Sequence, residues 1–237
     1  WDAWFHATEP MAERIPSAPV MGNHETYNLD WKVRRPEAYI HFFSLPSGDA
    51  EHYRNEFYSY DVGDVHFVVL NTQDEELQPW EPNLTEDEIA WFRRDMAATR
   101  KKWKVVLMHK DPLQYSFASR PEPRPEGFSE TGRIWMPIFD EYGVDLVLSA
   151  HLHTYRDRGH IRDFVRDAAG PLYLLTGIAG DVQYKGLWKR HALDVYEAPQ
   201  PEDRNYLVLD ASENKLTVTG YTKTGEEMHR SEERRVG

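Results

Sequence analysis

Three short apolar runs in this chain each end in a motif that carries histidine, and this pattern constrains the fold more than any other feature. The motifs are Gly-Asn-His-Glu at residues 22–25, Val-Leu-Met-His at residues 106–109 and Ala-His-Leu-His at residues 150–153. A continuous apolar run of this kind is typical of a strand buried in a parallel sheet. In open α/β sheets, ligands bind outside the carboxyl ends of the strands. The sequence therefore predicts that the three motifs meet at one site.

Apolar runs and helical spacing alternate along the chain, which favours the α/β class. Helices are expected over residues 1–14, 85–102 and 133–142. Strands are expected over residues 17–21, 57–60, 65–70, 104–108, 144–149, 172–176, 206–209, 215–221 and 226–229. No internal repeat or low-complexity linker interrupts this order, so one domain with a central sheet between layers is the simplest interpretation.

Two local features add detail to this outline. Thr85 is followed three residues later by Glu88, and this capping-box pattern predicts that a helix begins at Thr85. The Pro-rich segment 115–130 is too long for a simple connection, so it is expected to form the rim of a pocket.

The absence of cysteine limits the chemistry of any metal site. Disulfides and thiolate ligands are excluded, so a metal would be held by His, Asp, Glu, Asn or Tyr. The net charge of -12 would repel a phosphate backbone, which argues against a nucleic-acid partner. No run of about 18 apolar residues occurs, so no membrane span is expected.

Asparagine and histidine at three strand ends point to metal binding. A single histidine after a strand is more often structural or solvated than a ligand. In the His-x-His of residues 151–153, however, alternate side chains of an extended backbone would point the same way, so two imidazoles would face one cavity. Asparagine offers a neutral carbonyl oxygen and histidine a neutral imidazole, which suit Fe, Zn or Mn. Together, the three motifs predict a metal site.

These motifs resemble the third, fourth and fifth motifs of the calcineurin-like metallophosphoesterase superfamily, and within it the purple acid phosphatase branch. The resemblance covers residues 1 to about 229 and implies a layered metallophosphoesterase-type β-sandwich flanked by helices. Ala150 stands where the family usually has glycine. After Tyr155 the chain reads Arg156-Asp-Arg158, whereas the family often reads Tyr-Glu-Arg, so the arginine is displaced by one position.

The resemblance implies a role for each motif residue. Asn23, His109 and His151 would hold one metal ion, and His153 would hold the second. A hydroxide bridging the two ions, which would be Fe, Zn or Mn, would be the nucleophile. His24 would donate a proton or stabilise the phosphate oxygens.

Three further residues stand near these motifs in the sequence. Glu25 is expected to orient a ligand rather than to bind a metal itself. Tyr115 and Tyr155 are expected to line the substrate pocket.

The family's first two motifs, Asp-x-His and Gly-Asp-x-x-Asp/Tyr, supply the bridging aspartate, and nothing in residues 1–21 matches them. The resemblance therefore implies an N-terminally truncated domain, and we expect the chain to be inactive, or nearly so, in isolation. Residues 230–237 resemble a translated sequencing adapter, so residues 1–229 are expected to form the domain and the tail is set apart from it.

Three functions remain open at this point. The first is hydrolysis of phosphate esters of small molecules, the second is an inactive fragment or scaffold that retains the fold, and the third is a phosphodiesterase or nuclease of the same superfamily. The acidic net charge weighs against the nuclease.

Members of the branch are often exported, which implies an extracytoplasmic location. Nothing in the sequence indicates an oligomeric state.

Overall fold

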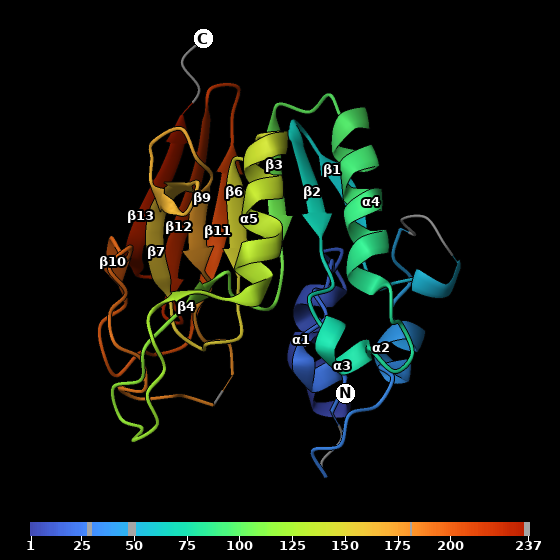
Figure 1. The fold of residues 1–237 in the computed structure, drawn as a ribbon, viewed down its shortest axis with the longest axis horizontal. Coiled ribbons are helices and arrows are strands. Elements are labelled where there is room, and N and C mark those ends of the chain that lie inside the picture. The colour runs from blue at the N-terminus through green and yellow to red at the C-terminus, as the bar shows by residue number, and fades with distance from the viewer. Residues whose placement is uncertain (28–29, 47–50, 181, 235–237) are drawn as a thin grey trace.

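A mixed central sheet organises the computed structural model, which describes residues 1–27, 30–46, 51–180 and 182–234 (Figure 1). The strand order is β1-β2-β3-β6-β9-β7-β10, with β8 paired to β7. The strands, in that order, are β1 (Tyr58–Val62), β2 (Val65–Val69), β3 (Trp103–Leu107), β6 (Leu146–Ser149), β9 (Leu172–Leu175), β7 (Arg156–Arg162), β10 (Tyr196–Glu197) and β8 (Val165–Arg166). Strands β2, β3, β6 and β9 are parallel to one another, so their carboxyl ends lie at one edge.

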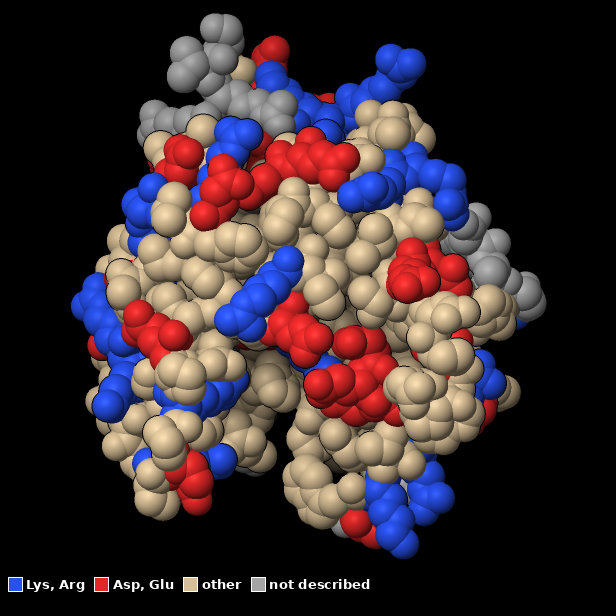
Figure 2. Space-filling view, in the orientation of Figure 1, with Lys and Arg blue, Asp and Glu red and all other residues tan. Residues whose placement is uncertain are grey.

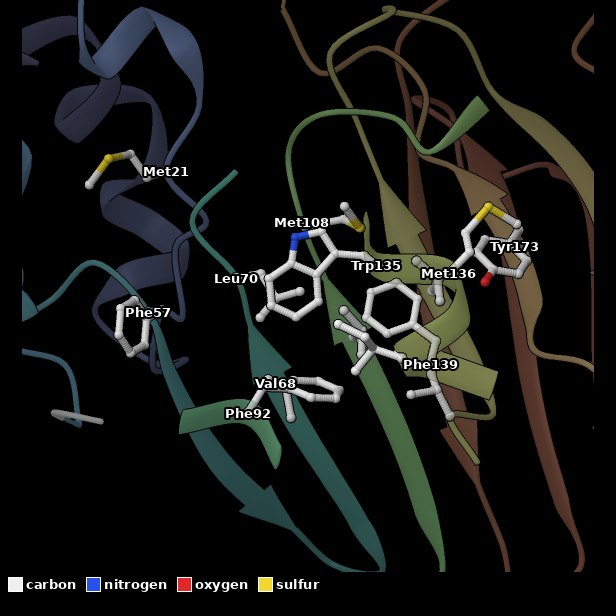
Figure 3. Close-up of a cluster of buried hydrophobic side chains, with 14 of the residues drawn as sticks. Met21, Phe57, Val68, Leu70, Phe92, Met108, Trp135, Met136, Phe139 and Tyr173 are labelled. Atoms are coloured by element: carbon white, nitrogen blue, oxygen red, sulfur yellow. The ribbon is translucent and has the colours of Figure 1, made fainter. Parts of the chain in front are cut away.

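Helices cover one face of this sheet. These are α4 (Leu84–Ala98) and α5 (Glu130–Tyr142), and they run alongside the central strands (Figure 1). Aromatic side chains of both helices, Phe92, Trp135 and Phe139, lie in one buried cluster with Val68 of β2 (Figure 3). Val106 of β3 belongs to the same cluster. Burial of this cluster fixes the helices on the sheet, because each side chain removed from water contributes on the order of 2 kcal/mol.

A three-stranded antiparallel sheet covers the other face. It consists of β11 (Asn205–Ala211), β12 (Lys215–Thr222) and β13 (Glu227–Arg234). Leu216 and Val218 of β12 are buried against Trp103 and Val105 of β3. The predicted α/β class and the predicted layered sandwich flanked by helices are therefore confirmed.

Shorter elements connect the layers and carry the loops at the sheet edge. They are α1 (Asp2–Ala12), η1 (Asn23–Glu25), α2 (Glu37–Phe42), η2 (Glu51–Tyr53), α3 (Asp74–Leu77), β4 (Leu113–Gln114) and β5 (Gly127–Phe128). The last two strands pair with each other, so that β4 precedes and β5 lies inside the segment predicted to be a pocket rim. None of the helices in the part of the chain that the structure describes is long and apolar enough to cross a membrane.

The two long helices differ in how they begin. Ser129 caps α5, because its hydroxyl oxygen accepts a hydrogen bond from the amide of Gly132 at 3.0 Å. The capping box predicted for α4 is wrong. Its N-cap is Asn83, without a side-chain cap, and Glu88 instead turns inward and accepts a hydrogen bond from the amide of Asn71 at 2.7 Å.

The strand predicted over residues 17–21 is also wrong, because this segment pairs with no strand in the described residues. Side chains hold it instead. The hydroxyls of Tyr39 and Tyr58 donate to the carbonyl of Pro19 at 2.9 and 2.8 Å. Met21 is fully buried, which anchors the end of the segment next to the first motif.

The final strand reaches beyond the predicted domain boundary at residue 229. In the β12–β13 ladder, Thr219 pairs with Arg230 and Val218 with Ser231. The Ser231 hydroxyl also donates to Asp157 at 2.5 Å. The structure therefore places residues 230–234 in the sheet, while residues 235–237 lie outside the described part of the chain. The origin of this tail stays a prediction.

Candidate metal centre

Three loops meet at the carboxyl edge of the parallel strands. His109 follows β3 and His151 follows β6, and these strands are parallel neighbours in the sheet. Asn23 begins η1, directly after the segment that Tyr39 and Tyr58 hold. The Nε2 atom of His109 lies 2.8 Å from Oδ1 of Asn23 and 3.1 Å from Nδ1 of His151. Three donor atoms from distant parts of the sequence thus face one point.

This donor set fits a first-row transition-metal ion. Two ligand atoms that each lie about 2.1 Å from one ion, at right angles, are about 3.0 Å apart. The distances from His109 to Asn23 and to His151, 2.8 and 3.1 Å, match this spacing. Each of the three atoms carries a lone pair, and a cation would satisfy all three at once, whereas a single proton on His109 would satisfy only part of the cluster.

Burial keeps both imidazoles neutral, which is the state that a metal ligand requires. Burial and the neighbouring His151 lower the pKa of His109 to about 3. Burial and the charge of Lys110 lower the pKa of His151 as well. Both rings therefore present lone pairs at neutral pH without first losing a proton.

Gly22 and Glu25 shape the turn that presents Asn23. A Cβ atom at Gly22 would lie 2.8 Å from the ring of His109, so only glycine allows this approach. The Glu25 carboxylate accepts a hydrogen bond from the amide of Gly22 at 2.8 Å, and burial raises its pKa. Glu25 therefore contacts the backbone of the turn, and its predicted orienting role acts through that backbone.

The His-x-His segment is a turn and not an extended strand. His151 has φ 72° and His153 has φ 51°, both in the left-handed region. The extended-backbone argument for this pair is therefore wrong, although both residues stand at the sheet edge. Ala150 is not among the positive-φ residues of the described chain, so its Cβ is accommodated where the family usually has glycine.

His153 faces a different neighbourhood from His151. Its Nδ1 donates to the carbonyl of Val182 at 2.9 Å, and its ring stacks on Tyr184 with the centroids 4.8 Å apart. With the proton on Nδ1, Nε2 keeps a lone pair for a ligand. Within residues 1–27, 30–46, 51–180 and 182–234, no group of three or more His, Cys, Asp or Glu side chains is placed to hold a metal ion.

His24 is exposed and lies against aromatic side chains. Its ring centroid is 5.4 Å from that of Trp31 and 6.3 Å from that of Tyr27. It lines a hollow of about 890 Å³ that also includes Trp1 and Trp4. A substrate could therefore reach the ring, but the ring does not share the groove that Asn23 and His151 line.

Tyr115 and Tyr155 do not lie where the sequence suggested. Both side chains are fully buried, and neither lines the groove of Asn23 and His151 or the hollow of His24. The Tyr115 hydroxyl donates to Asp194 at 2.5 Å, whereas Tyr155 packs beside Tyr196. Their predicted contact with substrate is wrong, because closeness in sequence to a strand end does not fix the direction of a side chain.

Sequence reasoning missed the charged groove beside the donor set. This groove of about 430 Å³ is lined by Asn23, His151, Lys110 and Arg124, and by Asp74, Glu75 and Glu76 of α3. Figure 2 shows acidic side chains gathered in the middle of this face, beside a hollow that opens between two lobes. The signal was present in the sequence, because α3 follows β2 at the same carboxyl edge.

The sequence of this chain is similar to those of known proteins. Residues 1–155 match the profile of the family described as calcineurin-like phosphoesterase. Purple acid phosphatase 23 of Arabidopsis thaliana is 28% identical over 186 residues, which are 77% of this chain and 38% of that protein. Purple acid phosphatase 15 of the same plant is 26% identical over 207 residues, which are 85% of this chain and 36% of that protein.

A solved structure has the same fold. It is the purple acid phosphatase isolated from yellow lupin (Lupinus luteus) seeds, with a TM-score of 0.67 and 18% sequence identity. The match covers 99% of this chain and 43% of the lupin chain. The chain thus spans well under half the length of these plant relatives.

Proposed function

Because the chain belongs to the calcineurin-like phosphoesterase family, we propose that it forms part of an enzyme that hydrolyses phosphate esters with the help of bound metal. One observation carries this proposal for the residues themselves. At the sheet edge, Nε2 of His109 lies 2.8 Å from the amide oxygen of Asn23 and 3.1 Å from the Nδ1 of His151, and both imidazoles are neutral.

The donor set limits the metal. An amide oxygen and two imidazoles, without thiolate, suit Fe, Zn or Mn. When bound, such an ion would lower the pKa of a water molecule and offset the negative charge of the phosphate. In the finer form of the proposal, which rests on the family resemblance, His153 would hold a second ion, and the two ions together would supply an activated water as the nucleophile.

Charged side chains in the groove would orient the ester. The Lys110 ammonium lies 2.9 Å from Glu76 and 3.7 Å from Glu75, so carboxylates offset its charge. The Arg124 guanidinium lies over Trp188 at 5.3 Å from the ring centroid, which holds it at the rim. We assign Arg124 to contact the phosphate. His24 would donate the proton to a leaving group that extends from this groove into the neighbouring hollow, which the His24 ring lines.

The acidic wall of the groove favours a small substrate. Asp74, Glu75 and Glu76 line the same groove as Asn23. A polyanionic nucleic acid would be repelled along this wall, whereas a compact phosphate ester would meet the metal and Arg124. Small phosphate esters, whether monoesters or diesters, are therefore proposed ahead of nucleic acids. Turnover of p-nitrophenyl phosphate against bis-p-nitrophenyl phosphate separates monoesters from diesters.

One specific observation favours the second candidate, a chain that binds metal but turns over slowly by itself. The described residues offer one convergent set of three ligands, in which the third ligand is an asparagine, and no cluster of three or more His, Cys, Asp or Glu. A chain with this set alone would hold one ion and lack the carboxylate that the family places between two ions.

Calorimetric titration of the 237-residue chain with Mn²⁺ tests the proposal. We expect one ion to bind, His109→Ala to weaken binding at least 10-fold, and the matched variant His6→Ala, at an exposed histidine of α1, to leave it unchanged. Binding that is equally tight in the His109→Ala variant would exclude this donor set. Two bound ions with rapid phosphatase turnover would instead exclude the second candidate, a chain that turns over slowly by itself.

A further inference from the structure

A buried ionic cluster joins β7 to the two loops that carry His109 and His151. We propose that Arg158 and Asp111, the central ion pair of this cluster, are positioning residues that hold the two imidazoles at the spacing one metal ion requires. This inference rests on the proposed function, because it concerns the same metal site. The proposal gives a role to Arg158, one of the two arginines that follow Tyr155.

Arg158 is fully buried and bonds to both loops. Its Nη2 lies 2.5 Å from Oδ2 of Asp111, and its Nη1 lies 3.4 Å from Oγ of Ser149. The Ser149 hydroxyl in turn donates to Oδ1 of Asp111 at 2.9 Å. Both oxygens of the Asp111 carboxylate are therefore engaged within the cluster.

The positions of these residues in the sequence explain their effect. Asp111 stands two residues after His109, and Ser149 stands two residues before His151. Their hydrogen bond is thus a side-chain cross-link between the loop after β3 and the end of β6, and Arg158 spans it from β7. Main-chain pairing between these loops continues as far as the Ala150 amide, which donates to the carbonyl of His109 at 3.0 Å.

Stability alone does not account for this ion pair. A buried charge pair loses the hydration of both groups, and well-packed apolar residues of similar volume often serve stability equally well. Its particular contribution is geometric, because a guanidinium fixes the direction of each bond that it donates. The Tyr115 hydroxyl accepts a further bond from Nε of Arg158 at 2.9 Å, which locks the guanidinium plane.

A second arginine on the same strand provides a matched control. Arg156 is also buried, but its guanidinium bonds to Asp194 at 3.2 Å and to Glu197. Neither of these partners belongs to the loops of His109 and His151. Nε of Arg156 also donates to Thr154 at 3.3 Å, but the Thr154 hydroxyl donates onward to Glu202 and takes no part in the bond between Ser149 and Asp111. Loss of Arg156 therefore removes a buried charge from β7 without removing the cross-link.

The experiment compares Arg158→Met with Arg156→Met in the complete chain. Mn²⁺ affinity is measured by titration, thermal unfolding is followed for each variant, and hydrogen exchange is recorded without metal over residues 109–111 and 149–153. We expect Arg158→Met to weaken Mn²⁺ binding about 10- to 100-fold and to speed exchange in both segments. Arg156→Met is expected to lower the unfolding temperature by a similar amount but to keep the affinity and the exchange of these segments.

A double variant separates positioning from stability if Arg158→Met folds poorly. In Asp111→Asn with Arg158→Met, no unpaired charge is left in the cluster, so the unfolding temperature should recover while Mn²⁺ affinity stays low. Recovery of both would overturn the positioning role, as would equal affinity and exchange in the two arginine variants.

The two proposals fail in different ways. If the unmodified chain binds no Mn²⁺ but Arg158→Met still speeds exchange in both segments, the metal site is refuted and the positioning of the loops stands. If the unmodified chain binds Mn²⁺ and the two arginine variants behave alike, the metal site stands and the positioning role is refuted.

Discussion

Gly22 shows how a single missing side chain permits the donor set. The Gly22→Ala variant would place a Cβ atom 2.8 Å from the His109 ring and so push the ring from Asn23. We expect a loss of about 1–3 kcal/mol in the free energy of unfolding and a weaker affinity for Mn²⁺. Chemical denaturation and metal titration measure the two effects.

Gly180→Ala serves as the control for that variant, because nothing lies within 4 Å of a Cβ atom at Gly180. Its stability and metal affinity should match those of the unmodified chain. Equal behaviour of the Gly22 and Gly180 variants would contradict the close approach to His109.

At the residue scale, the sequence predicted which site residues lie close together only where the order of the strands brings them together. His109 and His151 follow adjacent parallel strands, so strand order alone brings them together. The directions of Tyr115 and Tyr155 depend on buried partners such as Asp194, which lie far away in sequence and leave no local pattern. The left-handed backbone of His151 likewise follows from the turn between β6 and β7, and histidine spacing does not reveal it.

Among the elements, β13 gives the clearest test of where the folded unit ends. Removal of residues 230–237 would delete the partners of Val218 and Thr219 in β12 and leave Asp157 without the Ser231 hydroxyl. We expect a loss of at least about 1–3 kcal/mol, since a buried carboxylate loses a hydrogen bond.

Deletion of residues 235–237 alone is the control for this truncation. It leaves the β12–β13 ladder intact up to Arg234 and should keep the unfolding temperature of the complete chain. If the chain that ends at residue 229 were equally stable, residues 230–234 would contribute nothing to the fold.

His66 links the β1–β2 hairpin to α4 and should make stability depend on pH. Burial would lower its pKa, but hydrogen bonds to Asp95 at 2.7 Å and Asp61 at 2.8 Å outweigh burial and raise the pKa. The stabilisation is therefore complete below the unfolded value of about 6.5 and is lost as the pH rises through the higher folded value. Urea unfolding at several pH values from 5.5 to 8.5, set by these limits, should show this loss in the unmodified chain.

The His66→Gln variant provides the comparison for this titration. Glutamine can keep a hydrogen bond but carries no titrating charge, so the decline in stability above about pH 6.5 should be much smaller. An identical decline in both proteins would mean that another group causes it.

Helices and strands were predictable from the sequence where the residues of the segment itself determine its structure. The apolar runs that became β2, β3, β6 and β9 pack on both faces, so their sequences alone marked them as strands. Residues 17–21 are less apolar and contain Pro19, which has no backbone donor. A strand also needs a neighbour with free backbone groups, and none adjoins this segment in the described chain. The capping pattern at Thr85 failed because the buried amide of Asn71 binds Glu88 instead.

At the scale of the whole molecule, metal binding should be coupled to unfolding, because the donor set exists only in the folded chain. At a Mn²⁺ concentration 100 times the dissociation constant, linkage adds about 2.7 kcal/mol. For a chain of this size, that raises the unfolding temperature by roughly 5–10 °C. Differential scanning calorimetry with and without Mn²⁺ measures the shift, and addition of a chelator should reverse it.

The same measurement on His109→Ala shows whether the shift comes from this site. That variant lacks the nitrogen that faces both Asn23 and His151. With binding weakened at least 10-fold, the same Mn²⁺ concentration should raise its unfolding temperature by no more than about half as much as in the unmodified chain. A shift as large as that of the unmodified chain would assign the ion to another part of the molecule.

The segment 17–21, held by two tyrosine hydroxyls rather than by a sheet, has a consequence for how fast an ion leaves. His109 and His151 follow strands in the middle of the sheet. Asn23 instead follows a segment that has no strand partner in the described chain and that two hydrogen bonds to the Pro19 carbonyl hold in place. Dissociation should therefore begin with withdrawal of Asn23. Loss of these hydroxyls in Tyr39→Phe with Tyr58→Phe should shorten the residence time of Mn²⁺ more than it slows capture. Stopped-flow release into a chelator resolves the two rates, and an unchanged release rate would place the first opening step elsewhere.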